Sequence, residues 1–438
     1  MRSSTSTGYS LAALALSSLV VAASNGTNDY PPTYPLSTDP GFASEFVVAL
    51  QNSLTGGADI GPVLGAVKNI KPGDMDSYHE EFYRLANATK AQAEDPQNSY
   101  DPVNVRDTWF SASQYYRRAD VYIHRNWSDP LIQTVWNEQT AAFDKAIAAL
   151  PIPGQRLQIP SPEGNFTVEA IWYSASRNPH AKLPTMIVGN GFDAAQEDSY
   201  HYYCAAALAR GWNCITYEGP GQNTVRRTQG LGFIPEWELV ATPVVDYVLL
   251  AKKQVVDENR LVLVGNSMGG YFAARAAAFE PRLSAAVLIG GVWDTYEGYI
   301  SPLPKELLAV YEAGNYTQFD EQILALRDAE SEAFSTEAKW GLDYGLWAFK
   351  THSPSEFYSQ TKRYRIEDVV HQIDMPVFVG DAEFEGIYIG QAKKVSDALG
   401  ERATYHLFKG VAGYHCQSGA QQEMQRTIFA WLNRVLKA

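Results

Sequence analysis

The segment 261–271, Leu-Val-Leu-Val-Gly-Asn-Ser-Met-Gly-Gly-Tyr, constrains the fold more than any other part of this chain. An apolar, β-branched run ends at a Gly-x-Ser-x-Gly pentapeptide, and an alanine-rich helical pattern follows at once. A serine on such a turn exposes its hydroxyl at the edge of a sheet, while Gly265 and Gly269 keep Cβ atoms out of the bend. Free amides at the start of the helix can hold a developing oxyanion. The pattern predicts a nucleophile at Ser267 and indicates a serine hydrolase.

The rest of the C-terminal two thirds predicts a mostly parallel sheet. Strands are expected at 155–159, 165–173, 185–188, 213–217, 260–264, 285–289, 376–379 and 404–408. The first two are hairpin-like, and helical patterns near 199–210, 237–253, 268–279 and 390–399 separate most of the others. Such alternation is typical of a parallel sheet with helices on both faces. Eight strands, with the serine after the fifth, fit an α/β-hydrolase core.

Two regions outside this alternation are expected to be helical. Residues 24–150 lack convincing strand runs and are rich in aromatic side chains, which we expect to pack between helices. Within the hydrolase domain, 151–438, the alternation stops at about 293–372. This insertion follows the sixth strand, at the edge of the sheet where such folds bind ligands, so it is expected to form a lid. A final amphipathic helix is expected at 421–437.

Residues 1–23 have the pattern of a secretory signal peptide. Arg2 precedes an apolar run at 11–21, and small residues follow at the expected cleavage site after Ala23. The run is shorter than the roughly 20 residues that span a bilayer, so no membrane anchor is expected after cleavage. Sequons for N-glycosylation stand at Asn25, Asn87, Asn126, Asn165 and Asn315. We therefore expect a glycoprotein that is secreted or lies within the secretory pathway.

Charge and cysteine content exclude several classes of protein. Acidic residues outnumber basic ones 49 to 35 without a basic patch, so nucleic acid is not an expected partner. The sequence contains three cysteines, of which Cys204 and Cys214 lie in apolar contexts and are expected to be buried thiols rather than a bridge. No metal-binding motif is present, and neither a metal nor a cofactor is expected. The expected partner is a small-molecule substrate.

The serine requires a base and an acid that orients the base, in the chain order serine, acid, histidine. His406 falls inside the last expected strand, whereas His415 lies in a glycine-bearing loop beyond it, where the base is expected. Asp381, Glu383 and Glu385 all follow the seventh strand as candidates for the acid. Spacing favours Glu383 or Glu385, because the loop must extend beyond the strand before it turns toward the histidine.

The loop 189–193, Gly-Asn-Gly-Phe-Asp, is expected to complete an oxyanion hole. The backbone N–H of Phe192 is the best candidate for a second donor beside that of Met268. The same loop resembles a dinucleotide fingerprint, with Glu218 at the end of the next strand as the ribose-binding acid. We disfavour the nucleotide interpretation because it leaves the serine and the histidine without a role.

Several motifs together resemble one α/β-hydrolase family, which includes bacterial 2,6-dihydropseudooxynicotine hydrolase and fungal polyketide-shortening and fusarin-type hydrolases. The motifs are Gly191-Phe192-Asp193-x-x-x-Glu197, Tyr-Glu-Gly-Pro-Gly-Gln at 217–222, Gln-Gly-Leu-Gly-Phe at 229–233, Val-Ala-Thr-Pro-Val-Val-Asp-Tyr at 240–247, and the segment around Ser267. The resemblance extends from about Phe42 to the C-terminus. It implies a helical N-terminal domain, a lid and commonly a homodimer, with carbon–carbon bond hydrolysis or an intramolecular acyl rearrangement as the reaction.

The resemblance also bears on the acid. The family's strand-end pattern is similar to 381–391, with an aspartate where this chain has Glu385, and its histidine motif matches His-Cys-Gln-x-Gly-Ala at 415–420. It therefore implies a Ser267, Glu385, His415 triad. We expect a cofactor-free serine hydrolase of a small, polyketide-derived carbonyl compound. The alternatives are an esterase or transacylase with the same triad, and a non-catalytic binding protein on a hydrolase scaffold.

Overall fold

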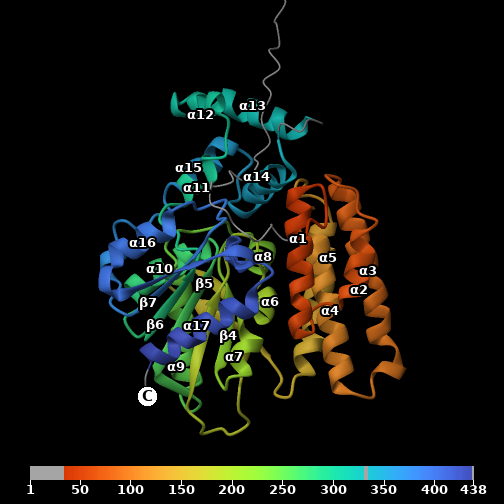
Figure 1. The fold of residues 1–438 in the computed structure, drawn as a ribbon, viewed down its shortest axis with the longest axis vertical. Coiled ribbons are helices and arrows are strands. Elements are labelled where there is room, and N and C mark those ends of the chain that lie inside the picture. The colour runs from red at the N-terminus through yellow and green to blue at the C-terminus, as the bar shows by residue number, and fades with distance from the viewer. Residues whose placement is uncertain (1–33, 330–333, 437–438) are drawn as a thin grey trace, which may run out of the picture.

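The computed structural model describes residues 34–329 and 334–436, which contain one eight-stranded sheet (Figure 1). Its strands are β1 (Gln155–Ser161), β2 (Phe166–Tyr173), β3 (Leu183–Gly189), β4 (Asn213–Glu218), β5 (Val256–Asn266), β6 (Ala285–Ile289), β7 (Val377–Ala382) and β8 (Ala403–Phe408). They are ordered β1-β2-β4-β3-β5-β6-β7-β8. The pairs β1–β2 and β2–β4 are antiparallel, and every other neighbouring pair is parallel. The predicted fold, a mostly parallel α/β sheet, is confirmed.

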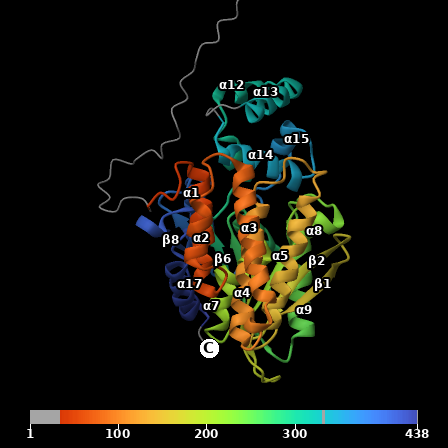
Figure 2. The same cartoon turned by 90° about the vertical axis from the view of Figure 1, so that its right-hand side faces the viewer.

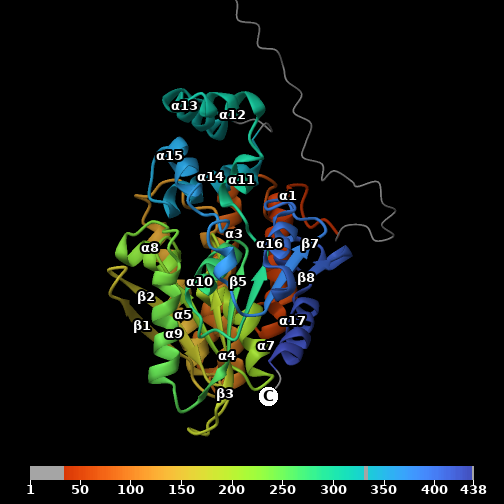
Figure 3. The same ribbon diagram turned by 90° about the vertical axis from the view of Figure 1, so that its left-hand side faces the viewer.

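Successive residues of the central strands enter separate cores, because side chains alternate between the faces of a sheet. Leu261 and Leu263 of β5 belong to one core, whereas Val262 and Val264 belong to the other. Helices α8 (Asn223–Gln229), α9 (Glu238–Ala251), α10 (Gly269–Phe279), α16 (Gln391–Leu399) and α17 (Gln421–Val435) accompany the sheet (Figure 3). Side chains of α9, α10 and α16 pack in the first core, and those of α17 in the second.

Five helices precede the sheet and stand beside the α/β domain (Figures 1 and 2). They are α1 (Pro40–Gln51), α2 (Ile60–Val67), α3 (Met75–Glu94), α4 (Pro102–Asp120) and α5 (Leu131–Ala148). Their aromatic side chains pack between helices as expected, and Tyr78, Phe82 and Tyr116 are fully buried. Phe110 and Phe143 extend this packing into the second core of the sheet. The N-terminal helices therefore cover part of one face of the sheet.

The insertion after β6 forms a helical cap. It contains α11 (Thr295–Ile300), α12 (Lys305–Glu312), α13 (Tyr316–Asp328), α14 (Thr336–Ala348) and α15 (Pro354–Thr361). Helices α12 and α13 lie farthest from the sheet in all three views (Figures 1, 2 and 3). Asp294 and Arg365 form an antiparallel bridge where the cap leaves the α/β domain and returns to it.

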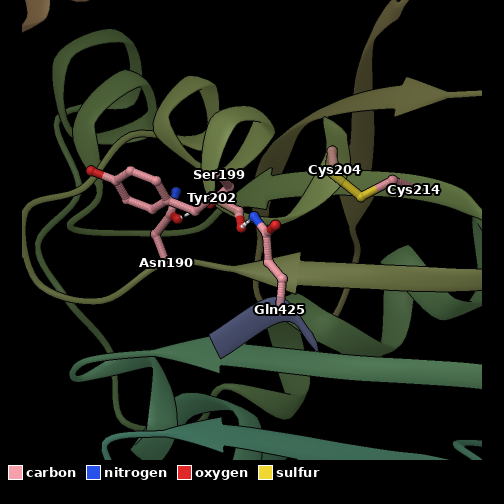
Figure 4. Close-up of a disulfide and its surroundings, with 6 residues drawn as sticks. All are labelled: Asn190, Ser199, Tyr202, Cys204, Cys214 and Gln425. Carbon is pink, nitrogen blue, oxygen red and sulfur yellow. Dashed lines mark hydrogen bonds between the residues drawn. A yellow bond between two sulfur atoms is a disulfide. The ribbon is translucent and has the colours of Figure 1, made fainter. Parts of the chain in front are cut away.

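One prediction about the cysteines is wrong. Cys204 and Cys214 form a disulfide, and Cys416 is free. Cys204 ends the π-helix η3 (Tyr200–Cys204), which lies between α6 (Gln196–Ser199) and α7 (Ala205–Leu208), and Cys214 lies in β4 (Figure 4). The apolar surroundings of the two cysteines suggested free thiols, but they suit a disulfide equally well. A disulfide buried in a core carries no polar group that needs hydrogen bonding.

Short 3-10 turns complete the chain. They are η1 (Asn52–Thr55), η2 (Pro96–Asn98), η4 (Val370–Gln372), η5 (Gly400–Arg402), η6 (Gly410–Ala412) and η7 (His415–Gln417). The expected signal peptide, 1–23, and the sequon at Asn25 lie outside the described residues. Across 34–329 and 334–436, no helix has the length and apolar character needed to cross a membrane.

Candidate active site

The Gly-x-Ser-x-Gly segment forms a sharp turn between β5 and α10. Ser267 has a φ of 58°, a left-handed conformation that is uncommon for residues other than glycine. A Cβ atom at Gly265 would come within 1.9 Å of the Gly269 carbonyl oxygen, so the turn requires glycine there. The Ser267 N–H donates to the Ile289 carbonyl at 2.8 Å, which ties the turn to the end of β6. The predicted turn is therefore present, and the structure adds that Ser267 adopts a left-handed conformation in it.

Ser267, His415 and Glu385 form a continuous hydrogen-bonded chain. The Ser267 hydroxyl donates to Nε2 of His415 at 2.9 Å. On the other side of the ring, the Nδ1–H donates to both Glu385 carboxylate oxygens, at 2.9 and 2.8 Å. The His415 side chain is 27% exposed and that of Glu385 only 7%, so the acid is buried behind the base. This arrangement prepares Nε2 to accept the serine proton.

The other two candidate acids are engaged elsewhere. One oxygen of Asp381 accepts the Tyr405 hydroxyl at 2.7 Å, and the other accepts a backbone N–H. Glu383 accepts the Gly410 N–H at 2.8 Å. Of the three carboxylates, the structure therefore brings Glu385 to the imidazole. The methylene that distinguishes it from the family's aspartate does not prevent this contact.

Glu385 and His415 each favour the charged form of the other. Burial opposes ionisation of Glu385, but the charge and hydrogen bond of His415 and the N–H groups of Ile387 and Tyr388 hold its pKa at about 2. Burial alone would lower the pKa of His415, yet the neighbouring Cys416 and Glu385 side chains raise it well above its ordinary value. Glu385 thus stabilises the imidazolium that forms when His415 takes a proton.

The two expected oxyanion donors adjoin the serine. A Cβ at Gly191 would come within 2.9 Å of both the Met268 nitrogen and the Ser267 Cβ, so the loop before Phe192 touches the turn directly. Among the described residues, neither the Phe192 N–H nor the Met268 N–H donates an intramolecular hydrogen bond. Two free N–H groups beside a nucleophile are the arrangement that an oxyanion needs.

Aromatic rings from the cap cover this part of the site. The Phe192 ring centroid lies 5.0 Å from that of Tyr344, 5.4 Å from that of Tyr299 and 6.1 Å from that of Trp340. The Tyr299 hydroxyl lies 3.6 Å from the Met268 sulfur. The sequence predicted a lid in this insertion without indicating which rings reach the serine, because that depends on how α11 and α14 fold back.

Other predicted features have structural positions away from the serine. His406 lies in β8 against the Phe378 and Phe408 rings. Glu218 is fully buried, and its carboxylate oxygens accept the N–H groups of Gln196 and Thr224, which accounts for an acid at this position without a ribose. Within 34–329 and 334–436, no group of three or more His, Cys, Asp or Glu side chains could hold a metal ion.

Comparison with known proteins agrees with this geometry. The sequence model of the family described as "Alpha/beta hydrolase family" matches residues 186–405. The chain belongs to the α/β-hydrolase family. It is a hydrolase of that superfamily, and the match spans β3 to β8, with the candidate triad residues Ser267 and Glu385 inside it.

Similar proteins from fungi match over most of their length. Hydrolase acrC of Aspergillus aculeatus is 28% identical over 415 residues, which cover 90% of this chain and 96% of that protein. Hydrolase ORFZ of Pyricularia oryzae is 30% identical over 353 residues, covering 76% and 80%. The 20-hydroxy-prefusarin hydrolase FUS2 of Gibberella moniliformis is 27% identical, covering 90% and 96%. The crystal structure of 2,6-dihydroxy-pseudo-oxynicotine hydrolase shares the fold, with a TM-score of 0.68 and 20% identity over 89% of this chain and 96% of that one.

Proposed function

We propose that this α/β-hydrolase uses Ser267 as a nucleophile to cleave a carbon–carbon bond next to a carbonyl, or a related acyl bond. The substrate class is a small, polyketide-derived secondary metabolite. The observation that carries the proposal is the hydrogen-bonded chain from Ser267 through His415 to Glu385. It has the order and the contacts by which a serine hydroxyl is activated.

The first half of the reaction forms an acyl-enzyme. His415 takes the Ser267 proton as the oxygen attacks a carbonyl carbon, and the N–H groups of Phe192 and Met268 hold the resulting oxyanion. Collapse of this intermediate breaks the bond to the neighbouring carbon. In a β-diketone the leaving group is an enolate, which takes its proton from His415. Glu385 remains ionised throughout, consistent with a pKa of about 2.

The second half regenerates the serine. His415 removes a proton from water, and the hydroxide attacks the acyl carbonyl in the same oxyanion hole. The products are a carboxylic acid and the ketone released in the first half. No cofactor takes part in either half.

Two observations support a flat, largely apolar substrate. Phe192 lies among Tyr299, Trp340 and Tyr344, so the approach to the oxyanion donors is lined by ring faces and edges. Two similar proteins are named for the hydrolysis of prefusarin and of pseudo-oxynicotine compounds, and we extend a related small-molecule chemistry to this chain.

The same triad also supports ester hydrolysis or transacylation, including ring closure. The choice depends on whether water or an internal nucleophile reaches the acyl-enzyme. Product masses separate the outcomes: carbon–carbon cleavage of a β-diketone gives an acid and a ketone, whereas ester cleavage gives an acid and an alcohol. Ring closure by an internal nucleophile gives a product lighter than the ester by the mass of the leaving alcohol, whereas transacylation to a second molecule adds the mass of that acceptor as well.

The direct test uses a fluorophosphonate probe read by intact mass. We expect one adduct on the wild-type protein and none on Ser267→Ala, with His415→Ala slowed by about 10³-fold or more. A folded wild-type protein that forms no adduct contradicts the proposed chemistry and favours the non-catalytic ligand-binding alternative.

We also propose that the protein is exported. The expected signal peptide, the buried Cys204–Cys214 disulfide and four exposed sequons support this location. Asn126, Asn165 and Asn315 lie in connections between elements, and Asn87 lies on an exposed part of α3. Expression in a secreting fungal host, followed by deglycosylation and mass measurement, tests the proposal; a cell-retained, unmodified and uncleaved product contradicts it.

A further inference from the structure

The motif Tyr-Glu-Gly-Pro-Gly-Gln at 217–222 has no part in the mechanism above, yet its last residue contacts the oxyanion loop. Gln222 is fully buried at the start of α8. Its Nε2 donates to the carbonyl oxygens of Asn190 and Gly191, both at 3.0 Å. Its Oε1 accepts the Gly219 N–H at 3.0 Å. Both amide hydrogens and the amide oxygen are therefore engaged, which fixes the orientation of this side chain.

The bond to Gly191 has a direct consequence for Phe192. The Gly191 carbonyl and the Phe192 N–H belong to the same peptide group, which is planar and trans. The C=O bond and the N–H bond of a trans peptide point in opposite directions. A donor that fixes the direction of the Gly191 carbonyl therefore also fixes the direction of the Phe192 N–H. Gly191, at the start of this peptide, adjoins the turn that carries Ser267, and the Phe192 N–H at its end donates no hydrogen bond within the described residues.

The peptide group that follows Asp193 is also held through its carbonyl oxygen. The Asp193 carbonyl accepts Nη2 of Arg117 and Nδ2 of Asn223, each at 2.7 Å. Arg117 comes from α4, so the N-terminal helices take part in fixing this loop. The backbone on both sides of Phe192 is thus held by buried side-chain donors.

We propose that Gln222 is a positioning residue for the oxyanion hole: its amide hydrogen bonds to the Asn190 and Gly191 carbonyls aim the Phe192 N–H at the oxyanion. The inference rests on the proposed function, because it requires an oxyanion at this site. Gln222 itself does not touch the reacting atoms. Its effect on the reaction passes through the orientation of one peptide group.

The variant Gln222→Leu removes both donors by replacing the amide with a branched apolar side chain. The second-order rate constant for fluorophosphonate labelling is expected to fall about 10- to 100-fold, somewhat less than for loss of an oxyanion donor itself. Gln229→Leu is the matched control. Gln229 lies at the other end of α8, where it donates one hydrogen bond to the Thr167 carbonyl and accepts one from the Thr167 N–H, on β2 and away from the serine. It is expected to lower the melting temperature and to leave the rate constant within about twofold.

The variant Gln222→Glu provides a pH-dependent readout that a general loss of stability would not produce. A carboxylate facing two carbonyl oxygens donates nothing, whereas the protonated acid donates one hydrogen bond. The ratio of variant to wild-type rate constants is therefore expected to rise as the pH is lowered from 8 to 5. Taking the ratio cancels the titration of His415, which both proteins share.

Each outcome has a defined meaning. A folded Gln222→Leu protein labelled within twofold of wild type overturns the positioning role, as does a Gln229→Leu protein slowed as much as Gln222→Leu. If Gln222→Leu does not fold, Gln222→Glu decides, and a ratio that is constant with pH overturns the proposal. A wild-type protein without an adduct instead refutes the proposed function, and the role of Gln222 fails with it.

Discussion

Buried ion pairs tie α4 of the N-terminal helices to the loop 189–193, to α6 and to α8, whereas aromatic rings join the cap to that loop. Arg117 of α4 is 1% exposed and pairs with Asp198 at 3.1 Å and with Asp193 at 3.4 Å. Asp120, also on α4, pairs with Arg227 of α8 at 2.7 Å. On the cap side, Phe192 of the oxyanion loop meets ring edges of α11 and α14.

The two kinds of contact constrain geometry differently. A buried charge pair is directional, and loss of one partner leaves an uncompensated charge in the interior. Ring contacts depend on buried area and tolerate several arrangements of similar energy. We infer that the N-terminal helices act as a fixed frame for the oxyanion loop, while the cap adapts to the substrate.

The largest expected effect comes from Arg117→Met. The variant leaves the buried carboxylate of Asp198 without one of its cationic partners, so the free energy of unfolding should fall by about 3–5 kcal/mol in urea denaturation. Adding Asp198→Asn should restore part of this loss, because it removes the uncompensated charge. A decrease below about 1 kcal/mol in the single variant would show that the frame does not depend on this pair.

The pH dependence of stability provides a second test, at the buried carboxylate of Glu218. Burial and the nearby Glu197 raise the pKa of Glu218 from 4.5 to about 7. The folded state therefore holds a proton that the unfolded state has released, and this stabilisation is complete below pH 4.5 and is lost as the pH rises through 7. We expect a loss of at most about 3 kcal/mol across this window. Glu218→Gln should flatten the profile; an unchanged profile would assign the pH dependence to other groups.

On the cap side, Trp340→Leu should alter selectivity more than stability. Trp340 is half-buried and meets Phe192 edge-on, a contact worth about 1 kcal/mol. The preference for a fluorophosphonate with an aromatic group over a small alkyl one should fall about 2- to 10-fold. Trp212→Leu is the control, because Trp212 is also half-buried and meets Phe429, far from the cap in sequence and packing. Equal selectivity in wild type and Trp340→Leu would show that the Trp340 ring does not contact the substrate.

The smallest effect is expected at an exposed ion pair between the N-terminal region and the cap. Arg125, after α4, pairs with Asp328 at the end of α13 at 2.7 Å, with side chains 57% and 48% exposed. Exposed pairs contribute about 0–1 kcal/mol and are screened by salt. Arg125→Ala should therefore change the free energy of unfolding by less than about 1 kcal/mol, and the difference should vanish in 1 M NaCl. A decrease in the free energy of unfolding above about 2 kcal/mol would mean that ion pairs also fix the position of the cap.

The sheet and the sharp turn that carries Ser267 were predictable because their signals are local. A strand buried on both faces is a continuous apolar run, so 261–264 was recognisable, and β6 (Ala285–Ile289) has the predicted bounds. The glycine turn at Ser267 and the position of His415 beyond the last strand follow from the order of the chain. These features required no knowledge of how distant segments pack.

The remaining features depend on contacts between distant segments. Glu383 and Glu385 are two residues apart, and only the path of the backbone decides which one reaches the imidazole. The Cys204–Cys214 bridge requires the π-helix to return its last residue to β4. Gln222 lay in a motif that the sequence did show, but its role depends on the carbonyls it meets in another loop.

The cap leaves and re-enters the α/β domain at nearly the same place. The Thr295 N–H donates to the Tyr364 carbonyl at 2.9 Å, and the Ile366 N–H donates to the Trp293 carbonyl at 3.0 Å. An insertion with adjoining ends can be lengthened, shortened or exchanged as a cassette without shifting the strands beneath it. Evolution can therefore replace the surfaces that select a molecule while inheriting the bond-breaking machinery intact, and a protein engineer can use the same two junctions for grafting.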